Sequence, residues 1–246
     1  MGRRYQKPPV IEALCEFQFE PSTPWDLTIP GLVYERIKGQ FPKKRPAKAL
    51  EVSVAAGPDG VRQSVLTTDR MQFLQADGNA LVQVAQDLLV VNQLKPYPTW
   101  REFLPLIRQG FDAYEQVVDP KGVRRVSLRY INRVEIPVSP LELADYFEFL
   151  PLVGPRLPQD FGNFMVGVEF GYEGSRDTLR LQMVSALGKA PDAHAVMLDL
   201  DYFLAQPGRT TLASVFEWVG RAHDRIEEVF EACIKDRLRT MFMEVT

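Results

Sequence analysis

Two arginines and two aspartates have the types and spacing from which binding chemistry can be argued. Arg129 and Arg133 lie four residues apart in residues 128–137, where polar and apolar side chains alternate as in a strand. Alternate side chains share one face of a strand, so the two guanidinium groups point the same way, about 13 Å apart. Guanidinium groups bind carboxylates and phosphates through paired donors. The strand therefore predicts recognition of an anionic group or of a charged segment of a protein partner.

Asp199 and Asp201 occupy alternate positions in residues 196–203, so both carboxylates emerge on one strand face. Two acids on one strand can hold Mg²⁺ when a third oxygen ligand joins them, and Glu169 on another predicted strand is a candidate. Acids and arginines on neighbouring strands more often neutralise each other. The aspartates and arginines therefore also predict cross-strand ion pairs, and we expect neither a metal nor another cofactor.

Tyr130 and Asn132 belong to the opposite row of the arginine strand, together with Val134. If Asn132 is buried, its amide needs hydrogen-bond partners, and a β-bulge that turns it outward would serve as well. With His223 from the last predicted helix, Tyr130 and Asn132 suit the wall of a small-ligand pocket between sheet and helix. A solid core accounts for the same pattern.

The elements that position these residues follow from hydrophobic periodicity. Thr99 and Glu102 have the spacing of a helix capping box, and Phe103, Leu106, Ile107 and later apolar residues form a core-facing stripe after them. The expected strands are residues 11–20, 50–56, 61–75, 79–94, the arginine strand from Val123, 163–172, 178–187 and 195–204. The expected helices lie near residues 32–37, from Thr99 to Val118, near 141–150, and from about 212 to 241.

Each half of the chain thus reads strand, helix, three strands, helix. We predict an α+β fold in which a duplicated β-α-β-β-β-α unit forms a curved antiparallel sheet with the long helices packed on one face. The first repeat would span residues 1–120 and the second residues 121–246, as two repeats or as one continuous domain. The arrangement resembles the TATA-binding-protein-like and helix-grip folds. This is a likeness of architecture, which does not supply function.

Composition bounds the class of protein. The chain has 246 residues, 46% hydrophobic and 25% charged, with a formal net charge of -3, which disfavours a general binder of polyanions. Cys15 and Cys233 each lie in an apolar pattern and predict buried, reduced thiols. No stretch has the length and apolar character of a membrane span. We therefore expect a cytoplasmic protein without a membrane partner.

Motifs of familiar enzymes do not occur in the sequence. It has no G-x-S-x-G elbow, no phosphate-binding G-x-x-x-x-G-K-[ST] and no G-x-G-x-x-G after a strand. With two histidines and two cysteines, the chain also has few ligands for zinc. Enzymatic activity is the minority interpretation.

Two stretches carry a family resemblance. Residues 5–13 read Tyr-Gln-Lys-Pro-Pro-Val-Ile-Glu-Ala, and residues 128–133 read Leu-Arg-Tyr-Ile-Asn-Arg with Ile136-Pro137 after them. Together with residues 97–100, Tyr-Pro-Thr-Trp, they resemble a sporadically distributed prokaryotic family of about this length. The resemblance implies no assigned activity, cofactor or catalytic residue. It implies an accessory role, in a mobile or defence-related gene neighbourhood.

The prediction for function is a non-enzymatic binding or regulatory protein that recognises a protein partner or an anionic group. Its proposed binding residues are Arg129, Tyr130, Asn132, Arg133, Asp199 and Asp201. One alternative is nucleic-acid binding, with basic residues near 43–48 and 121–125, and with Tyr130 or Phe73 stacked on bases only if these side chains face outward. The other alternative is the small-ligand pocket. The long final helix, with Met241 and Phe242 at an exposed end, suggests a homodimer.

Overall fold

The computed structural model describes residues 3–21, 24–57, 60–159, 162–189 and 193–245, and only the backbone within 49–57 and 60–67. The helices are α1 (Ile29–Ile37), α2 (Trp100–Val118), α3 (Val215–Cys233) and α4 (Asp236–Phe242), with a 3₁₀ turn at Leu143–Asp145. The strands are β1 (Arg4–Tyr5), β2 (Val10–Phe19), β3 (Lys43–Gly57), β4 (Gly60–Leu74), β5 (Ala80–Ala85), β6 (Leu88–Leu94), β7 (Val123–Ile136), β8 (Met165–Tyr172), β9 (Asp177–Leu187), β10 (His194–Leu204) and β11 (Glu244–Val245).

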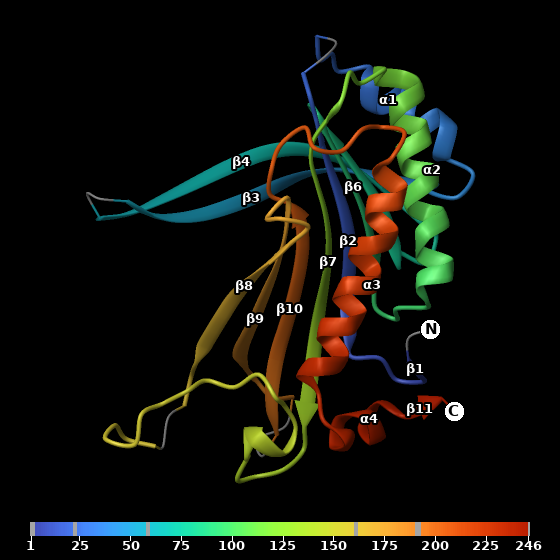
Figure 1. Cartoon of the computed structure of the whole chain (residues 1–246). Helices are drawn as coiled ribbons and strands as arrows, with labels where there is room; N and C mark the ends of the chain where they lie inside the picture. Colours follow the sequence, from blue (N-terminus) through green and yellow to red (C-terminus); the bar gives the residue numbers. More distant parts are fainter. Residues whose placement is uncertain (1–2, 22–23, 58–59, 160–161, 190–192, 246) are drawn as a thin grey trace. The chain divides into compact units, whose positions relative to one another are not determined.

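The fold is α+β, as predicted, with a large antiparallel sheet (Figure 1). In the described residues this sheet has nine strands in the order β3-β4-β5-β6-β2-β7-β10-β9-β8, and β1 pairs with β11 separately. No helix in the described part of the chain is long and apolar enough to cross a membrane.

The chain divides into two compact units. Unit 1 comprises Met1–Cys15, Leu94–Tyr97 and Val123–Thr246, and unit 2 comprises Glu16–Gln93 and Pro98–Gly122. Unit 1 therefore contains β7 to β10 with α3, and unit 2 contains β3 to β5 with α1 and α2.

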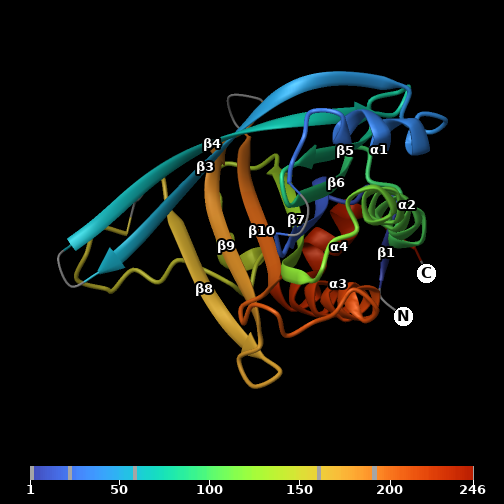
Figure 2. The same ribbon diagram turned by 90° about the horizontal axis from the view of Figure 1, so that it is seen from above.

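The core of unit 1 lies between α3 and the strands β7 and β10 (Figure 2). Its strand side comes from the even-numbered row of β7, whose predicted members are buried: Val126, Leu128, Tyr130, Val134 and Ile136. Its helix side is a stripe at helical spacing that includes Val215, Trp218, Val219, Ala222 and Ile226. Alternation with period two on the strand and period 3.6 on the helix places both rows in one apolar layer.

The core of unit 2 contains the predicted stripe of α2. Its residues Phe103, Leu106, Ile107, Phe111, Tyr114 and Val118 are all buried. Thr99 is the N-cap, as predicted, although its hydroxyl donates to the Glu102 carboxylate at 2.7 Å and makes no side-chain cap to the backbone. Gly110 lets α2 approach the sheet closely, because a Cβ there would lie 2.9 Å from Cγ2 of Val91.

The prediction of one long final helix was wrong. The chain leaves the helix after Cys233, because Ile234 adopts an extended backbone (φ -107, ψ 151) and forms a β-bridge with Phe147. The amide of Lys235 then donates to the carbonyl of Tyr146 at 2.9 Å. Tertiary backbone hydrogen bonds thus replace helical ones.

The expected exposed apolar end of this helix was also wrong. Phe242 is 6% exposed, with its ring edge-on to Tyr5 at 5.6 Å and stacked on Phe230 at 6.5 Å. The ground for a homodimer through this end of the chain is therefore removed.

Two further elements differ from the prediction. The expected helix at residues 141–150 is only the 3₁₀ turn Leu143–Asp145, because Phe147 is held in the β-bridge to Ile234. The expected strand at residues 79–94 is a hairpin of β5 and β6, in which Ala85 pairs with Leu88. Asp87 makes this turn with a left-handed backbone (φ 53), a conformation that Asp tolerates better than most residues.

Candidate functional site

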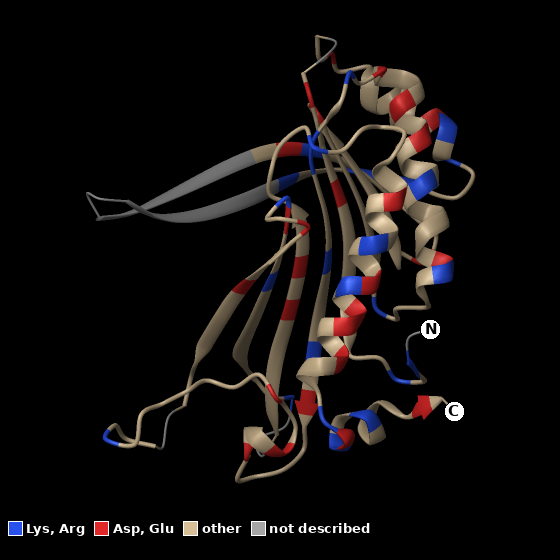
Figure 3. Ribbon diagram, viewed as in Figure 1, with Lys and Arg blue, Asp and Glu red and all other residues tan. Residues whose placement is uncertain are grey.

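Four charged residues form a row across the sheet of unit 1. The strand register sets Arg129 on β7 opposite Asp201 on β10, Asp201 opposite Arg180 on β9, and Arg180 opposite Glu169 on β8. Directly opposite residues share one sheet face, so this charge row alternates in sign. Figure 3 shows the charged positions recurring along these strands.

The side-chain hydrogen bond of Arg129 does not go to Asp201, the residue directly opposite it in the charge row. Arg129 donates to the Asp199 carboxylate through two guanidinium nitrogens, with Nε 2.8 Å from Oδ1. This bidentate bond is the main cause of the raised pKa of Arg129. Arg180 Nε donates to Glu169 at 2.8 Å. The cross-strand ion pair predicted for Arg129 and Asp199 is thus confirmed.

Arg133 forms no such cross-strand ion pair with any described residue. Its Nε donates to Glu135 on the same strand at 2.7 Å, and its Nη2 donates to the carbonyl of Leu187 at 2.6 Å. Glu135, a neighbour on β7, therefore neutralises Arg133. No guanidinium group among the described residues pairs with Asp201 at less than 3.9 Å.

Asp201 is the unusual member of the charge row. Its only ion pair in the described part of the chain is Arg125 at 3.9 Å, whose guanidinium lies 4.6 Å from the centroid of the Phe203 ring. Its Oδ1 is buried and accepts no hydrogen bond from the described residues. Burial raises the pKa of Asp201, and Arg125 and Arg129 offset this in part. A carboxylate oxygen in this state can accept a donor from outside the chain.

The carboxylate of Asp201 lines a small pocket. The pocket has a volume of about 60 Å³ and is also lined by Arg129, Arg180, Gln182 and Asp199. This is room for the tip of one polar side chain or for a water molecule.

Tyr130 and Asn132 lie on the opposite face from the arginines, and both are buried. The hydroxyl of Tyr130 is 2.9 Å from the hydroxyl of Tyr97 and 3.3 Å from Nδ1 of His223. Asn132 donates to the carbonyl of Leu198 at 3.1 Å, so no bulge is needed to satisfy it. At 6% and 1% exposure, Tyr130 and Phe73 do not face outward, so the condition under which either could stack on a base is not met.

His223 completes the buried polar cluster under β7. Burial lowers the pKa of His223 to about 4, and the nearby Asp224 raises it slightly. The imidazole is therefore neutral at physiological pH and suited to a hydrogen bond with Tyr130.

The geometry gives the aspartates little capacity for Mg²⁺. The Asp199 carboxylate already accepts hydrogen bonds from Arg129. The carboxylate of Glu169, the third ligand considered, accepts one from Arg180. No group of three His, Cys, Asp or Glu side chains in the described residues is arranged to hold a metal. We propose no metal at this face.

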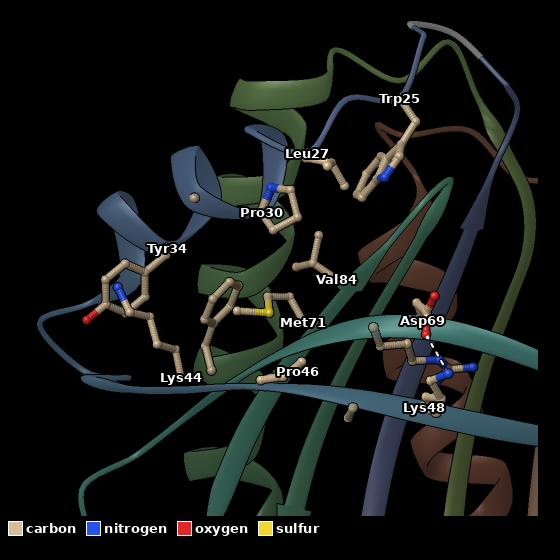
Figure 4. A pocket seen from close by; sticks show the side chains of 14 residues that line it. Trp25, Leu27, Pro30, Tyr34, Lys44, Pro46, Lys48, Asp69, Met71 and Val84 are labelled. Atoms are coloured by element: carbon tan, nitrogen blue, oxygen red, sulfur yellow. Dashed lines mark ion pairs between the residues drawn. The ribbon is translucent and has the colours of Figure 1, made fainter.

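Unit 2 contains a larger pocket that the sequence did not indicate (Figure 4). This unit 2 pocket has a volume of about 680 Å³. Its wall includes Trp25 and Leu27 before α1, Tyr34 on α1, and Met71 and Phe73 on β4. Leu27 is 92% exposed. The one signal in the sequence was an apolar pair, Trp25 and Leu27, in an otherwise polar stretch rich in proline.

No protein-family model, curated protein or solved structure matches this chain. The fold and the two sites define an α+β sheet protein with a charge-paired sheet face in unit 1 and an apolar pocket in unit 2.

Proposed function

We propose that this protein is a non-enzymatic binding protein that recognises a protein partner through the charge-row face of unit 1. The observation that carries the proposal is the Asp201 carboxylate, whose Oδ1 is buried beside the 60 Å³ pocket without a donor from the described residues. A hydrogen-bond donor on the partner would satisfy it. On binding, this donor exchanges its hydrogen bond to water for one to Asp201. A partner without a matching donor would leave the carboxylate oxygen unsatisfied, which favours a specific complex.

The charge balance favours a protein over a nucleic acid. Arg129, Arg133 and Arg180 are each paired with a carboxylate on the same face. Binding to a phosphate backbone depends on cations that can replace its counterions. Paired arginines supply little of that attraction, whereas alternating charges match the polar part of a protein interface.

An apolar row lies on the same face. In register, Met197 on β10 lies opposite Val184 on β9, and Val184 lies opposite Met165 on β8. Met165 is 71% exposed. Methionine and arginine are enriched in protein interfaces. The face therefore combines an apolar contact area with charged groups that would orient a bound partner.

We further propose that the two halves descend from one duplicated unit. In each half the last strand of the series returns beside the first, β6 next to β2 and β10 next to β7. This supports a TATA-binding-protein-like or helix-grip-like relationship. The motifs at residues 5–13 and 128–133 support membership of the sporadic prokaryotic family and a role in an accessory locus, and two buried cysteines fit the cytoplasm.

A site-specific photocrosslinker tests the proposed function. We would place p-benzoylphenylalanine at Gln182, inside the small pocket, and at Glu217 on α3 as the control, and irradiate cells of the native host. We expect a discrete crosslinked protein at Gln182 and none at Glu217. The crosslinked protein is then purified, and its affinity is measured against folded variants of this chain.

Charge reversal provides the decisive arm. Arg180→Glu should weaken the purified complex by about tenfold or more, whereas Arg225→Glu, at an exposed side chain of α3, should leave it unchanged. Equal affinity of wild type and Arg180→Glu would contradict a partner site at this face, as would equal crosslinking at Gln182 and Glu217.

A further inference from the structure

The unit 2 pocket has a continuous apolar wall. Trp25 and Leu27, which precede α1, and Pro30 in its first turn face Met71 and Val84 across the pocket (Figure 4). The rings of Tyr34 and Phe73 lie 5.3 Å apart at a tilt of 35° and continue the wall toward β3. A volume of about 680 Å³ is in the range of pockets that enclose small organic ligands.

The charged groups at this pocket are unequal in sign. Lys44, Lys48 and Arg70 line it, against the single carboxylate of Asp69. Lys48 takes that carboxylate in an ion pair at 3.9 Å. The ammonium of Lys44 lies 4.6 Å from the centroid of the Tyr34 ring and, in the described residues, forms no ion pair. Lys44 therefore gives this apolar cavity a positive group that no described carboxylate pairs with.

We propose that the unit 2 pocket binds an amphiphilic anion, a molecule with an apolar body and one acidic group such as a carboxylate. The apolar wall would hold the body by excluding water from it. Lys44 would serve as the counter-ion, because its ammonium is placed at the aromatic wall and pairs with no carboxylate among the described residues. This site lies wholly in unit 2 and does not depend on the partner surface of unit 1.

The positive charge of Lys44 and the apolar wall together favour an amphiphilic anion over other classes of ligand. A neutral apolar ligand would gain nothing from Lys44, and a cation would be repelled by it. A polyphosphate would leave the apolar wall unfilled. Only a ligand that combines an apolar body with an acid uses both features.

Two fluorescent probes that share one apolar body test the proposal on the full chain. 1-Anilinonaphthalene-8-sulfonate carries an acidic group, and N-phenyl-1-naphthylamine lacks it. We expect saturable binding of the sulfonate at one site, about tenfold tighter than the neutral probe, since a hydrogen bond to a charged group contributes on that scale. Dodecanoate should displace the sulfonate, whereas dodecanol should displace it poorly.

Three variants separate the wall from the counter-ion. Lys44→Gln should weaken the sulfonate about tenfold and leave the neutral probe unchanged. Gly31→Trp should block both probes, because a Cβ at Gly31 meets no atom within 4 Å and the indole would occupy the pocket. Arg45→Gln is the matched control, an exposed basic neighbour bound to Gln72 and outside the pocket wall.

The result that would overturn the proposal is equal affinity for the two probes in the wild type. Sulfonate binding that persists in Gly31→Trp would place the probe elsewhere and would also overturn it. Unchanged thermal unfolding of each variant excludes binding to an unfolded fraction, and Arg180→Glu in unit 1 should leave probe binding intact whether or not the partner surface exists.

Discussion

Arg129 lies opposite Asp201 in the register of β7 and β10, yet its guanidinium group binds Asp199, two residues away along β10. The choice gives Arg129 two parallel hydrogen bonds to one carboxylate, the strongest geometry available to arginine. It leaves Asp201 with one long ion pair, to Arg125, among the residues whose side chains are described. One diagonal bond thus creates both the stable pair and the unsatisfied carboxylate of the charge row.

The Arg129–Asp199 pair should couple by about 1 kcal/mol in a double-mutant cycle of Arg129→Gln and Asp199→Asn, because it is bidentate but partly exposed. Urea unfolding of the four proteins measures this. The exposed pair of Arg225 and Glu228 on α3 is the control, with about 0.3 kcal/mol expected. Equal coupling in the two cycles would contradict a special role for the bidentate geometry.

Asp201→Asn should raise the free energy of unfolding at neutral pH. Burial raises the pKa of Asp201 in the folded state, so folding takes up a proton between the unfolded and folded pKa values, and stability falls as pH rises through that window. The neutral amide removes this loss. The advantage of the variant should shrink as pH approaches the unfolded pKa of about 4. A stability gain independent of pH would point to some other cause.

His223 should make unit 1 less stable in mild acid. Burial lowers its pKa from 6.5 to about 4, so stability is fully present above pH 6.5 and is lost as pH falls toward 4. The loss is at most about 3 kcal/mol. Urea unfolding across this range should show a steeper decline for wild type than for His223→Gln, and His194→Gln, at an exposed histidine, is the matched control.

Asp177→Ala should be the most destabilising single substitution of a charged residue in unit 1, by about 3–5 kcal/mol. The buried carboxylate accepts hydrogen bonds from Trp218 Nε1 at 2.9 Å and from the Tyr202 hydroxyl at 3.2 Å, and it pairs with Arg176. The substitution leaves the two buried donors, Trp218 and Tyr202, unsatisfied and removes the ion pair of Arg176. Tyr202→Phe removes one bond only and should cost about 1 kcal/mol. Thermal or urea unfolding would rank them, and a small loss for Asp177→Ala is the contradicting outcome.

Gly110→Ala should destabilise unit 2, while Gly220→Ala should stabilise unit 1. Both glycines are helical, and alanine gains up to about 1 kcal/mol from helix propensity. At Gly110 the new Cβ would lie 2.9 Å from Val91, and overpacking of this kind costs about 1–3 kcal/mol. At Gly220 no atom lies within 4 Å. Shifts of the same sign in urea unfolding would show that the contact to Val91 relaxes freely.

The predictions that held were those that depend on local pattern. The buried row of β7 and the stripe of α2 were predicted, because apolar periodicity states directly which side of an element loses contact with water. The prediction missed the local turn at Asp87 that divides residues 79–94 into β5 and β6, and it failed at the end of the chain, where backbone partners are distant in sequence. The β-bridge between Ile234 and Phe147 ends α3 early, and it prevents residues 141–150 from forming the expected helix.

The sequence by itself determined most of the strands, the helices α1 and α2, and the face on which the arginines and aspartates lie, since these follow from side-chain spacing within one element. Only the tertiary structure decided that Arg129 takes Asp199 over Asp201, and that Trp25, Tyr34 and Met71 meet around one pocket. The reason is physical: pairing depends on the register and approach of strands and helices that are distant in sequence, and no local pattern encodes those distances.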